Sequence, residues 1–298
     1  MNSFMSGFAA FVIRCSGRKT MYGKPEKREK YIANLAVKNE KPFHLPPFPY
    51  RTKPAGYMAG GTEMLIFNKG KERKIIYLHG GAFCEPPLLP HFMFCDRVAA
   101  ATDSEILFPI YKKAPVHTYD ETFSLLERLY RHLLRGGTAP QNIVMMGDSS
   151  GGGLALSFCE YLKETDLPQP SRLVLLSPWL DVSMDTPFSA EVDRVDPNLQ
   201  YDFLKIAGKN WAGETDVHDY RVSPIYGNVT GLAPMTVYYG THENLILDAR
   251  KFREKCDAAG VPLDWHEAEG MNHVYVIYPI PEANAAQKEI IALLNNEN

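Results

Sequence analysis

From Thr62 onwards, the apolar positions of the chain fall into two alternating patterns. Short continuous apolar runs, as long as buried strands, are separated by longer stretches in which apolar residues recur with helical spacing. The runs that predict strands are residues 64–67, 74–78, 105–110, 142–146, 172–176, 235–239 and 263–267. The stretches that predict helices are residues 119–134, 150–162, 248–259 and 282–294. This alternation predicts an α/β fold with a doubly wound, mainly parallel sheet.

The residues before this region follow a different pattern. Phe4, Phe8, Phe11 and Val12 recur at helical spacing, which predicts an amphipathic helix packed on the body of the protein. A second helix is predicted at residues 26–37. Prolines at positions 42, 46, 47, 49 and 54 then exclude regular structure. We interpret residues 1–60 as an N-terminal cap or lid arm that contributes no strand, laid across a main domain of residues 61–298.

Residues 181–225 interrupt the strand–helix rhythm of the main domain. Prolines, aspartates and Trp211 replace the regular apolar runs there. We interpret this stretch as a helical cap insertion over the same end of the sheet.

Charge and composition narrow the classes of function. The formal net charge of −3 at pH 7 gives no general attraction to nucleic acid or to an anionic membrane. The apolar stretch 7–13 is too short to span a bilayer and follows no basic segment, so neither stable membrane insertion nor a signal peptide is expected. The five cysteines form no C-x-x-C pair, which predicts reduced thiols in a cytoplasmic protein. The oligomeric state stays open.

The clearest local signal is the stretch Gly147-Asp148-Ser149-Ser150-Gly151-Gly152-Gly153. A predicted strand precedes it and a predicted helix follows it, and this is the context in which G-x-S-x-G marks a nucleophilic serine. A side chain at 147 or 151 would clash in so sharp a turn, while the strain lifts the Ser149 hydroxyl above the end of the sheet. A flexible Gly–Ser loop and a phosphate-binding loop are the alternatives, but the stretch fits neither G-x-x-x-x-G-K-[ST] nor G-x-G-x-x-G.

A second glycine-rich motif, His79-Gly80-Gly81-Ala82-Phe83, directly follows the strand 74–78. Its small residues let backbone N–H groups approach a substrate oxygen, and together with the N–H of Ser150 they predict an oxyanion hole. An ordinary tight turn is the alternative. His79 precedes the glycines, so we interpret it as a brace for this loop rather than as a catalyst.

A nucleophilic serine needs a general base, and the base needs a carboxylate that orients it. On a sheet of this type, the expected order along the chain is serine, acid, histidine. His273 follows the last predicted strand and precedes the final helix, so it is the predicted base. His266, within the strand, and His242, beside the acid loop, are the weaker alternatives.

Glu243 is the predicted acid because it follows the strand 235–239, at the carboxyl end where active sites of open α/β sheets form. Asp248 stays open as an alternative, although it better suits the first turn of the next helix. Glu269 is expected to face solvent. The sequence holds no His, Cys or Asp cluster with the spacing of a metal site, so no metal or other cofactor is predicted.

Several stretches together carry a resemblance to a known family. They are HGGAF at 79–83, YKKAP at 111–115, GDSSGG at 147–152, SPWLD at 177–181, SPIYG at 223–227 and GMNH at 270–273. They resemble the hormone-sensitive-lipase-like family of α/β-hydrolase esterases, especially its small bacterial members. Residues 1–60 lie outside the strong match.

The resemblance implies an α/β-hydrolase fold with Ser149 as nucleophile and His273 as base. It also implies that Gly81, Ala82 and Ser150 donate the N–H groups of the oxyanion hole. The chain departs from the family pattern at three places. Glu243 stands where the family usually has Asp, Ala82 replaces the third glycine of H-G-G-G, and Lys112-Lys113 replace Arg-Leu.

These features predict a serine carboxylesterase of the acetyl esterase type, which hydrolyses short-chain acyl esters through an acyl-enzyme and has a small-molecule ester as its partner. A non-catalytic small-molecule receptor on a hydrolase scaffold is one alternative, but such relatives have a broken triad, and all three triad residue types are present here. A small peptidase or amidase is the other, although the chain has no second large domain to gate peptides.

Overall fold

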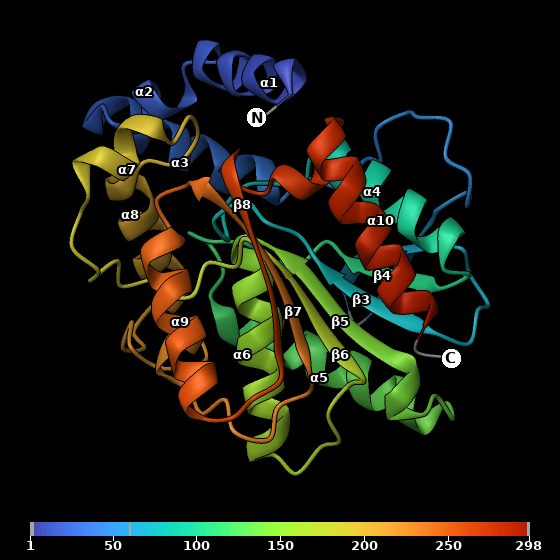
Figure 1. Cartoon of the computed structure of the whole chain (residues 1–298). Coiled ribbons are helices and arrows are strands. Elements are labelled where there is room, and N and C mark those ends of the chain that lie inside the picture. The colour runs from blue at the N-terminus through green and yellow to red at the C-terminus, as the bar shows by residue number, and fades with distance from the viewer. Residues whose placement is uncertain (1–2, 60, 297–298) are drawn as a thin grey trace.

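An eight-stranded sheet forms the centre of the computed structural model, which describes residues 3–59 and 61–296. The strand order is β1-β2-β4-β3-β5-β6-β7-β8 (Figure 1). The strands are β1 (Ala55–Ala59), β2 (Thr62–Phe67), β3 (Lys74–Leu78), β4 (Glu105–Pro109), β5 (Ile143–Asp148), β6 (Arg172–Leu176), β7 (Met235–His242) and β8 (Leu263–Asn272). Strand β2 pairs antiparallel with β1 and β4, and the other pairs are parallel, so the predicted mainly parallel sheet is confirmed.

Helices cover both faces of the sheet. The helices α4 (Leu89–Ala101) and α10 (Pro281–Asn295) pack on one face, and α5 (Tyr119–Arg135), α6 (Ser150–Glu164) and α9 (Ile246–Ala258) pack on the other. Strand β5 shows why both faces are apolar. Ile143 and Met145 join the core under α5 and α6, whereas Val144 and Met146 join the core under α4 and α10.

Helix α4 was not predicted from the sequence. Its stretch LPHFMFCDRVAAA is apolar around most of its circumference, and buried positions occur on nearly every side. A helix buried on most sides lacks the helical period that marks a half-exposed helix. The three short 3-10 helices are η1 (Pro140–Asn142), η2 (Pro224–Tyr226) and η3 (Tyr275–Ile277).

The N-terminal arm and the mid-chain insertion lie side by side near the carboxyl ends of the parallel strands (Figure 1). The arm contains α1 (Phe4–Cys15), α2 (Arg18–Tyr22) and α3 (Pro25–Asn39), and the insertion contains α7 (Ala190–Val195) and α8 (Tyr201–Ala212). Tyr22 of α2 stacks on Phe203 of α8 at 4.1 Å between ring centroids. The expectation that none of the first 60 residues joins the sheet is wrong for β1, an edge strand whose mostly exposed residues give no alternating pattern.

Helix α1 packs in the opposite sense to the prediction. Phe4, Phe8 and Phe11 are exposed, while Ser6 is buried and Ala9 is half-buried. The body therefore receives the small side chains of this helix rather than its aromatic ones. No helix within residues 3–59 and 61–296 is both long and apolar enough to cross a membrane.

Candidate active site

Ser149 occupies the sharp turn between β5 and α6. Its backbone has φ 52° and ψ −124°, a conformation that costs energy for any residue with a side chain. The flanking glycines make the turn feasible. A Cβ on Gly147 would lie 2.5 Å from the carbonyl oxygen of Gly151, and one on Gly151 would lie 2.1 Å from that of Leu78. The predicted need for glycine at both positions therefore has a direct steric cause.

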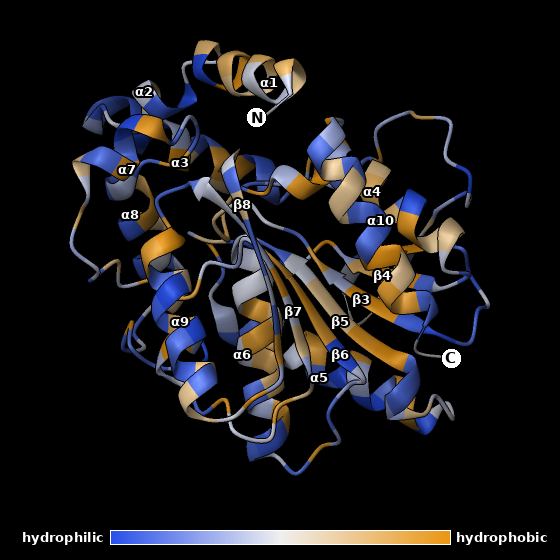
Figure 2. Ribbon diagram, in the orientation of Figure 1, coloured by the Kyte–Doolittle hydropathy of each residue, from blue (hydrophilic) through white to orange (hydrophobic). Residues whose placement is uncertain are grey.

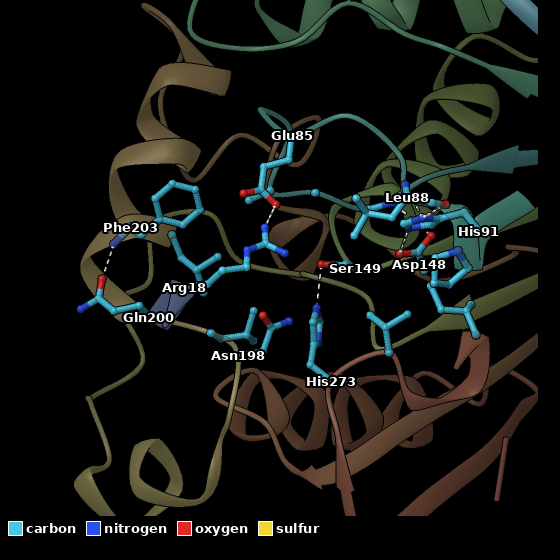
Figure 3. A pocket seen from close by; sticks show the side chains of 18 of the residues that line it. Arg18, Glu85, Leu88, His91, Asp148, Ser149, Asn198, Gln200, Phe203 and His273 are labelled. Atoms are coloured by element: carbon cyan, nitrogen blue, oxygen red, sulfur yellow. Dashed lines mark hydrogen bonds and ion pairs between the residues drawn. The ribbon is translucent and has the colours of Figure 1, made fainter. Parts of the chain in front are cut away.

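A continuous chain of hydrogen bonds joins the three predicted triad residues. The Ser149 hydroxyl lies 2.8 Å from Nε2 of His273, and Nδ1 of His273 lies 2.7 Å from Oε2 of Glu243. Figure 3 shows the hydroxyl of Ser149 and the ring of His273 pointing toward one another. His273 directly follows β8 and Glu243 directly follows β7, so two neighbouring strands deliver base and acid to the same end of the sheet.

The triad residues are all buried, and their charges shift one another's pKa. Burial raises the pKa of Glu243, and the facing His273 opposes that shift only in part. Burial alone would lower the pKa of His273, but the carboxylate of Glu243, and beyond it that of Asp196, raises it above the usual histidine value. The negative charge behind the imidazole therefore favours proton transfer from the serine to His273.

The alternative residues lie elsewhere. Asp248 sits in the first turn of α9, where its carboxylate accepts the hydroxyl of Thr186, and burial raises its pKa to about 6. Its carboxylate has no hydrogen bond to His273 among the contacts of the described residues. Glu269 is exposed, and His266 stacks on Tyr238 at 4.3 Å between ring centroids.

The backbone N–H groups of Gly81, Ala82 and Ser150 donate no hydrogen bond within the part of the chain that the structure describes. Gly81 and Ala82 line the same cavity as Ser149 and His273. Gly81 has φ 125°, and a Cβ added at this position would lie 2.7 Å from the carbonyl oxygen of Glu85, so glycine is required there. Ala82 has φ 50°, a left-handed conformation in which the family's usual glycine would be unstrained.

His79 lies beneath this loop and has no contact with the triad in the described structure. Its ring stacks on Tyr111 at 4.4 Å and on Phe108 at 5.7 Å between centroids, and its Nδ1 lies 2.7 Å from the carbonyl oxygen of Gly80. Complete burial lowers the pKa of His79, and the nearby Lys113 lowers it further, so the ring stays neutral. These contacts support the interpretation of His79 as a brace.

Sequence analysis missed a polar cluster under the serine turn. The buried carboxylate of Asp148 accepts the Tyr77 hydroxyl at 2.7 Å and the Gly80 N–H at 3.0 Å, and Nε2 of His91 lies 3.2 Å away. Burial would raise the pKa of Asp148, but the charge and hydrogen bond of His91 keep it below the usual value. This cluster ties the serine turn to the loop of the predicted oxyanion hole. Asp148 directly precedes Ser149 in the motif, and this position was a sequence signal for the cluster. Its partner His91 lies in helix α4, which was not predicted from the sequence.

A cluster from the N-terminal arm closes another side of the cavity. Arg18, Tyr22 and Tyr31 all direct side-chain donors to the carboxylate of Glu85, and the hydroxyl of Tyr31 lies 2.6 Å from it. The cavity has a volume of about 90 Å³. Figure 3 shows Arg18, Glu85 and Phe203 on one side of Ser149, and Leu88 and His91 on the other.

Comparison with known proteins assigns this chain to a family of known fold. A family model described as an alpha/beta hydrolase fold matches residues 75–277. An esterase of Acinetobacter venetianus is 32% identical over 219 residues, which cover 72% of this chain and 72% of the relative. An acetyl-hydrolase of Streptomyces hygroscopicus is 28% identical over 216 residues, which cover 72% of each chain.

Solved structures agree with the sequence relatives. A putative esterase from Staphylococcus aureus is 29% identical, covers 93% of this chain and 95% of its own, and superimposes with a TM-score of 0.88. An esterase from the bacterial hormone-sensitive lipase family, at 24% identity and a TM-score of 0.79, shows the likeness of fold alone, over 92% of this chain and 98% of its own. The predicted α/β-hydrolase fold is confirmed.

Proposed function

Because this chain belongs to the alpha/beta hydrolase fold family, and within it to the esterases that resemble hormone-sensitive lipase, we propose that it is a serine carboxylesterase acting on short-chain acyl esters. One observation carries the proposal. The hydroxyl of Ser149, on a strained turn, is hydrogen-bonded to His273, which is hydrogen-bonded in turn to a buried carboxylate, Glu243. This arrangement suits nucleophilic attack on a carbonyl carbon.

In the first half of the reaction, the ester carbonyl oxygen binds among the N–H groups of Gly81, Ala82 and Ser150. His273 takes the proton of Ser149 on its Nε2 as the serine oxygen attacks the carbonyl carbon. The N–H groups hold the negative oxygen of the tetrahedral intermediate. The C–O bond to the alcohol then breaks, and the alcohol leaves with the proton from His273.

In the second half, water hydrolyses the acyl-enzyme at the same groups. His273 accepts a proton from water, whose oxygen attacks the acyl carbon. The bond to the serine oxygen breaks, Ser149 recovers its proton from His273, and the carboxylic acid leaves. Throughout both halves, Glu243 fixes the orientation of the imidazole and stabilises its positive charge.

The size of the cavity supports a short acyl chain. The cavity has a volume of about 90 Å³, and its lining includes Tyr22 of the N-terminal arm and Phe203 and Leu204 of the 181–225 insertion. Such a volume holds several water-sized groups, enough for an acetyl or butyryl group but not for a long extended chain. The acetyl-hydrolase among the relatives agrees with this size class.

The proposal is tested with Ser149→Ala and with esters of increasing acyl length. We expect the variant to lose nearly all turnover on p-nitrophenyl acetate, and a fluorophosphonate probe to label the wild type but not the variant. Full activity of the variant would remove Ser149 from the mechanism.

No labelling of the wild type by the fluorophosphonate probe would favour the receptor alternative. Faster turnover of an aminoacyl anilide than of the acetate would favour the peptidase, and faster turnover of a long-chain ester would contradict the short-chain specificity.

A further inference from the structure

Helix α1 carries its large apolar side chains on the outside of the molecule. Phe4, Met5, Phe8, Phe11 and Val12 have exposed fractions of 88, 52, 57, 60 and 49%. At 3.6 residues per turn, these side chains fall on one stripe that covers about a third of the helix circumference. We call these five residues the α1 stripe. A contiguous apolar surface of this kind marks a site of interaction.

Polar contacts at both ends hold α1 in place with the stripe outward. The hydroxyl of Ser3 donates to Glu282 of α10 at 2.9 Å, and the guanidinium of Arg14 donates to the carbonyl oxygen of Val195, at the end of α7, at 2.7 Å. The helix therefore lies across the molecule from α10 to α7. Figure 2 shows it as an apolar helix at the edge of the molecule, separate from the apolar strands of the sheet. No element in the described structure covers the α1 stripe, since its residues are exposed in the folded chain.

The arm that carries the stripe is basic, although the whole chain is acidic. Residues 1–60 contain eleven Lys or Arg and three Glu, a net charge of +8, while the full chain carries −3, which leaves −11 for the remainder. Lys24, Lys27 and Lys30 line one groove of this arm together with Thr20 and Asn34. None of the three lysines takes part in an ion pair between described residues. The positive charge of the groove is therefore available to an external partner.

We propose that the N-terminal arm docks on the surface of a bilayer that contains anionic lipids. The α1 stripe enters the interface between headgroups and acyl chains, and Lys24, Lys27 and Lys30 face the headgroups. Exposed aromatic side chains on one helix face, combined with basic residues of the same arm, bind an anionic bilayer in this way without spanning it. The net charge of −3 does not oppose docking, because each basic residue near the surface acts through its local field within a Debye length.

A second copy of the chain fits the same surface less well. Helix α1 has 12 residues and is about 18 Å long, so its outer face offers far less than the roughly 800 Å² per partner of a standard interface. A symmetric dimer would also place the arm of one copy, with its net charge of +8, against the same arm of the other copy. A lipid surface requires no shape match and supplies the opposite charge.

The docked orientation would bring the mouth of the active site close to the lipid. Arg18 and Tyr22, which follow α1 directly in the chain, line the cavity that contains Ser149. Esters dissolved in the interface would then be concentrated near the cavity. Docking itself requires no chemistry at the site, so it can be tested independently of the esterase activity.

Co-sedimentation of the full chain with lipid vesicles tests the proposal. We expect binding to vesicles of phosphatidylcholine mixed with phosphatidylglycerol to exceed binding to phosphatidylcholine alone by on the order of 100-fold, since three lysines contribute together. High salt should weaken the binding, because it screens the charges. Equal binding to both kinds of vesicle, or none to either, would overturn the proposal.

Substitutions test whether the α1 stripe, rather than other exposed apolar side chains, is the part of the arm that binds the vesicles. We expect Phe8→Ser/Phe11→Ser to lower the partition coefficient by at least about tenfold. Val37→Ser, which removes an exposed apolar side chain of α3 outside the stripe, should leave it unchanged. All variants should retain turnover on a soluble acetate ester, which shows that they are folded. Unchanged vesicle binding by the double variant would contradict the proposal, as would a dimer of the wild type in solution that the double variant dissociates.

Discussion

The carboxylate of Asp196 accepts the backbone N–H of Asn244, the residue after Glu243, at 2.8 Å. Asp196 is completely buried and lies in the mid-chain insertion, where its other oxygen accepts two further backbone N–H groups. The insertion therefore holds the loop that carries Glu243, the proposed acid. The same carboxylate lies close enough to His273 to contribute to the raised pKa of that residue. The insertion thus acts on the triad as well as forming a wall of the cavity.

We expect Asp196→Asn to move the acid limb of the kcat/KM profile to lower pH. The imidazole of His273 must be neutral to accept the serine proton, so activity falls as the pH drops through the pKa of His273. Burial alone would lower this pKa, whereas Glu243 and then Asp196 raise it. Loss of the second negative charge lowers the pKa, and the limb shifts downward. Asp202→Asn removes an exposed carboxylate of the same insertion and serves as the control. An upward shift, or equal profiles for both variants, would contradict this assignment.

A second prediction concerns the identity of the acid. We expect Glu243→Gln to lower turnover by roughly 1000-fold or more, since the amide can no longer hold the imidazole in the required tautomer or stabilise its charge. Asp248→Asn should retain most of the turnover, because Asp248 bonds to Thr186 and not to His273. Both variants are assayed on one short ester, with melting temperatures measured in parallel. The reverse order of losses would make Asp248 the acid.

The serine turn and the order of the triad residues could be predicted from the sequence because local sterics determine them. Only glycine fits at 147 and 151, and only a short strand–turn–helix segment places Ser149 above the end of the sheet. Parallel strands bring their carboxyl ends together, so residues that follow β7 and β8 meet there. These relations require no knowledge of how distant side chains pack.

Features that depend on such packing could not be predicted from the sequence. Asp196 and Asn244 meet only because the insertion folds back over the strand ends, and no periodicity encodes that contact. Helix α4 was not predicted because a helix that is buried on most sides has no polar face. His91 lies in this helix, so its place under the serine turn was not predicted either. The predicted orientation of α1 is wrong for a related reason, since helical spacing identifies an apolar face without showing whether that face turns inward.

Ser150 provides a third prediction, because its side chain has a structural role beside the expected one of its backbone N–H. The hydroxyl of Ser150 accepts the backbone N–H of Phe83, in the loop of the predicted oxyanion hole, at 3.2 Å. Ser150→Ala leaves this buried N–H without a partner, at a cost of about 1–3 kcal/mol. We expect turnover to fall by about tenfold with little change in KM, because the N–H groups of the predicted oxyanion hole shift. Ser157→Ala, at a buried serine about two turns further along α6, is the control. Equal kinetics for the two variants would contradict the role of the hydroxyl.

The last prediction concerns the link between the N-terminal arm and the oxyanion loop. The carbonyl oxygen of Gly81 accepts the N–H of Glu85 at 2.8 Å, while the carboxylate of Glu85 binds Arg18, Tyr22 and Tyr31 of the arm. Glu85 therefore connects three side chains of the arm to the backbone of Gly81.

We expect Glu85→Gln to lower turnover by about tenfold, because removing one partner of a partly buried ion pair leaves the charge of Arg18 uncompensated and loosens the arm against the loop. Tyr31→Phe removes one donor from the same carboxylate and should cost less, because the ion pair with Arg18 remains. Asp202→Asn breaks the more exposed ion pair between Arg28 and the insertion and should change turnover very little. Turnover and KM on p-nitrophenyl acetate distinguish the cases: if Glu85→Gln raises only KM, the carboxylate serves to bind the ester and does not position Gly81.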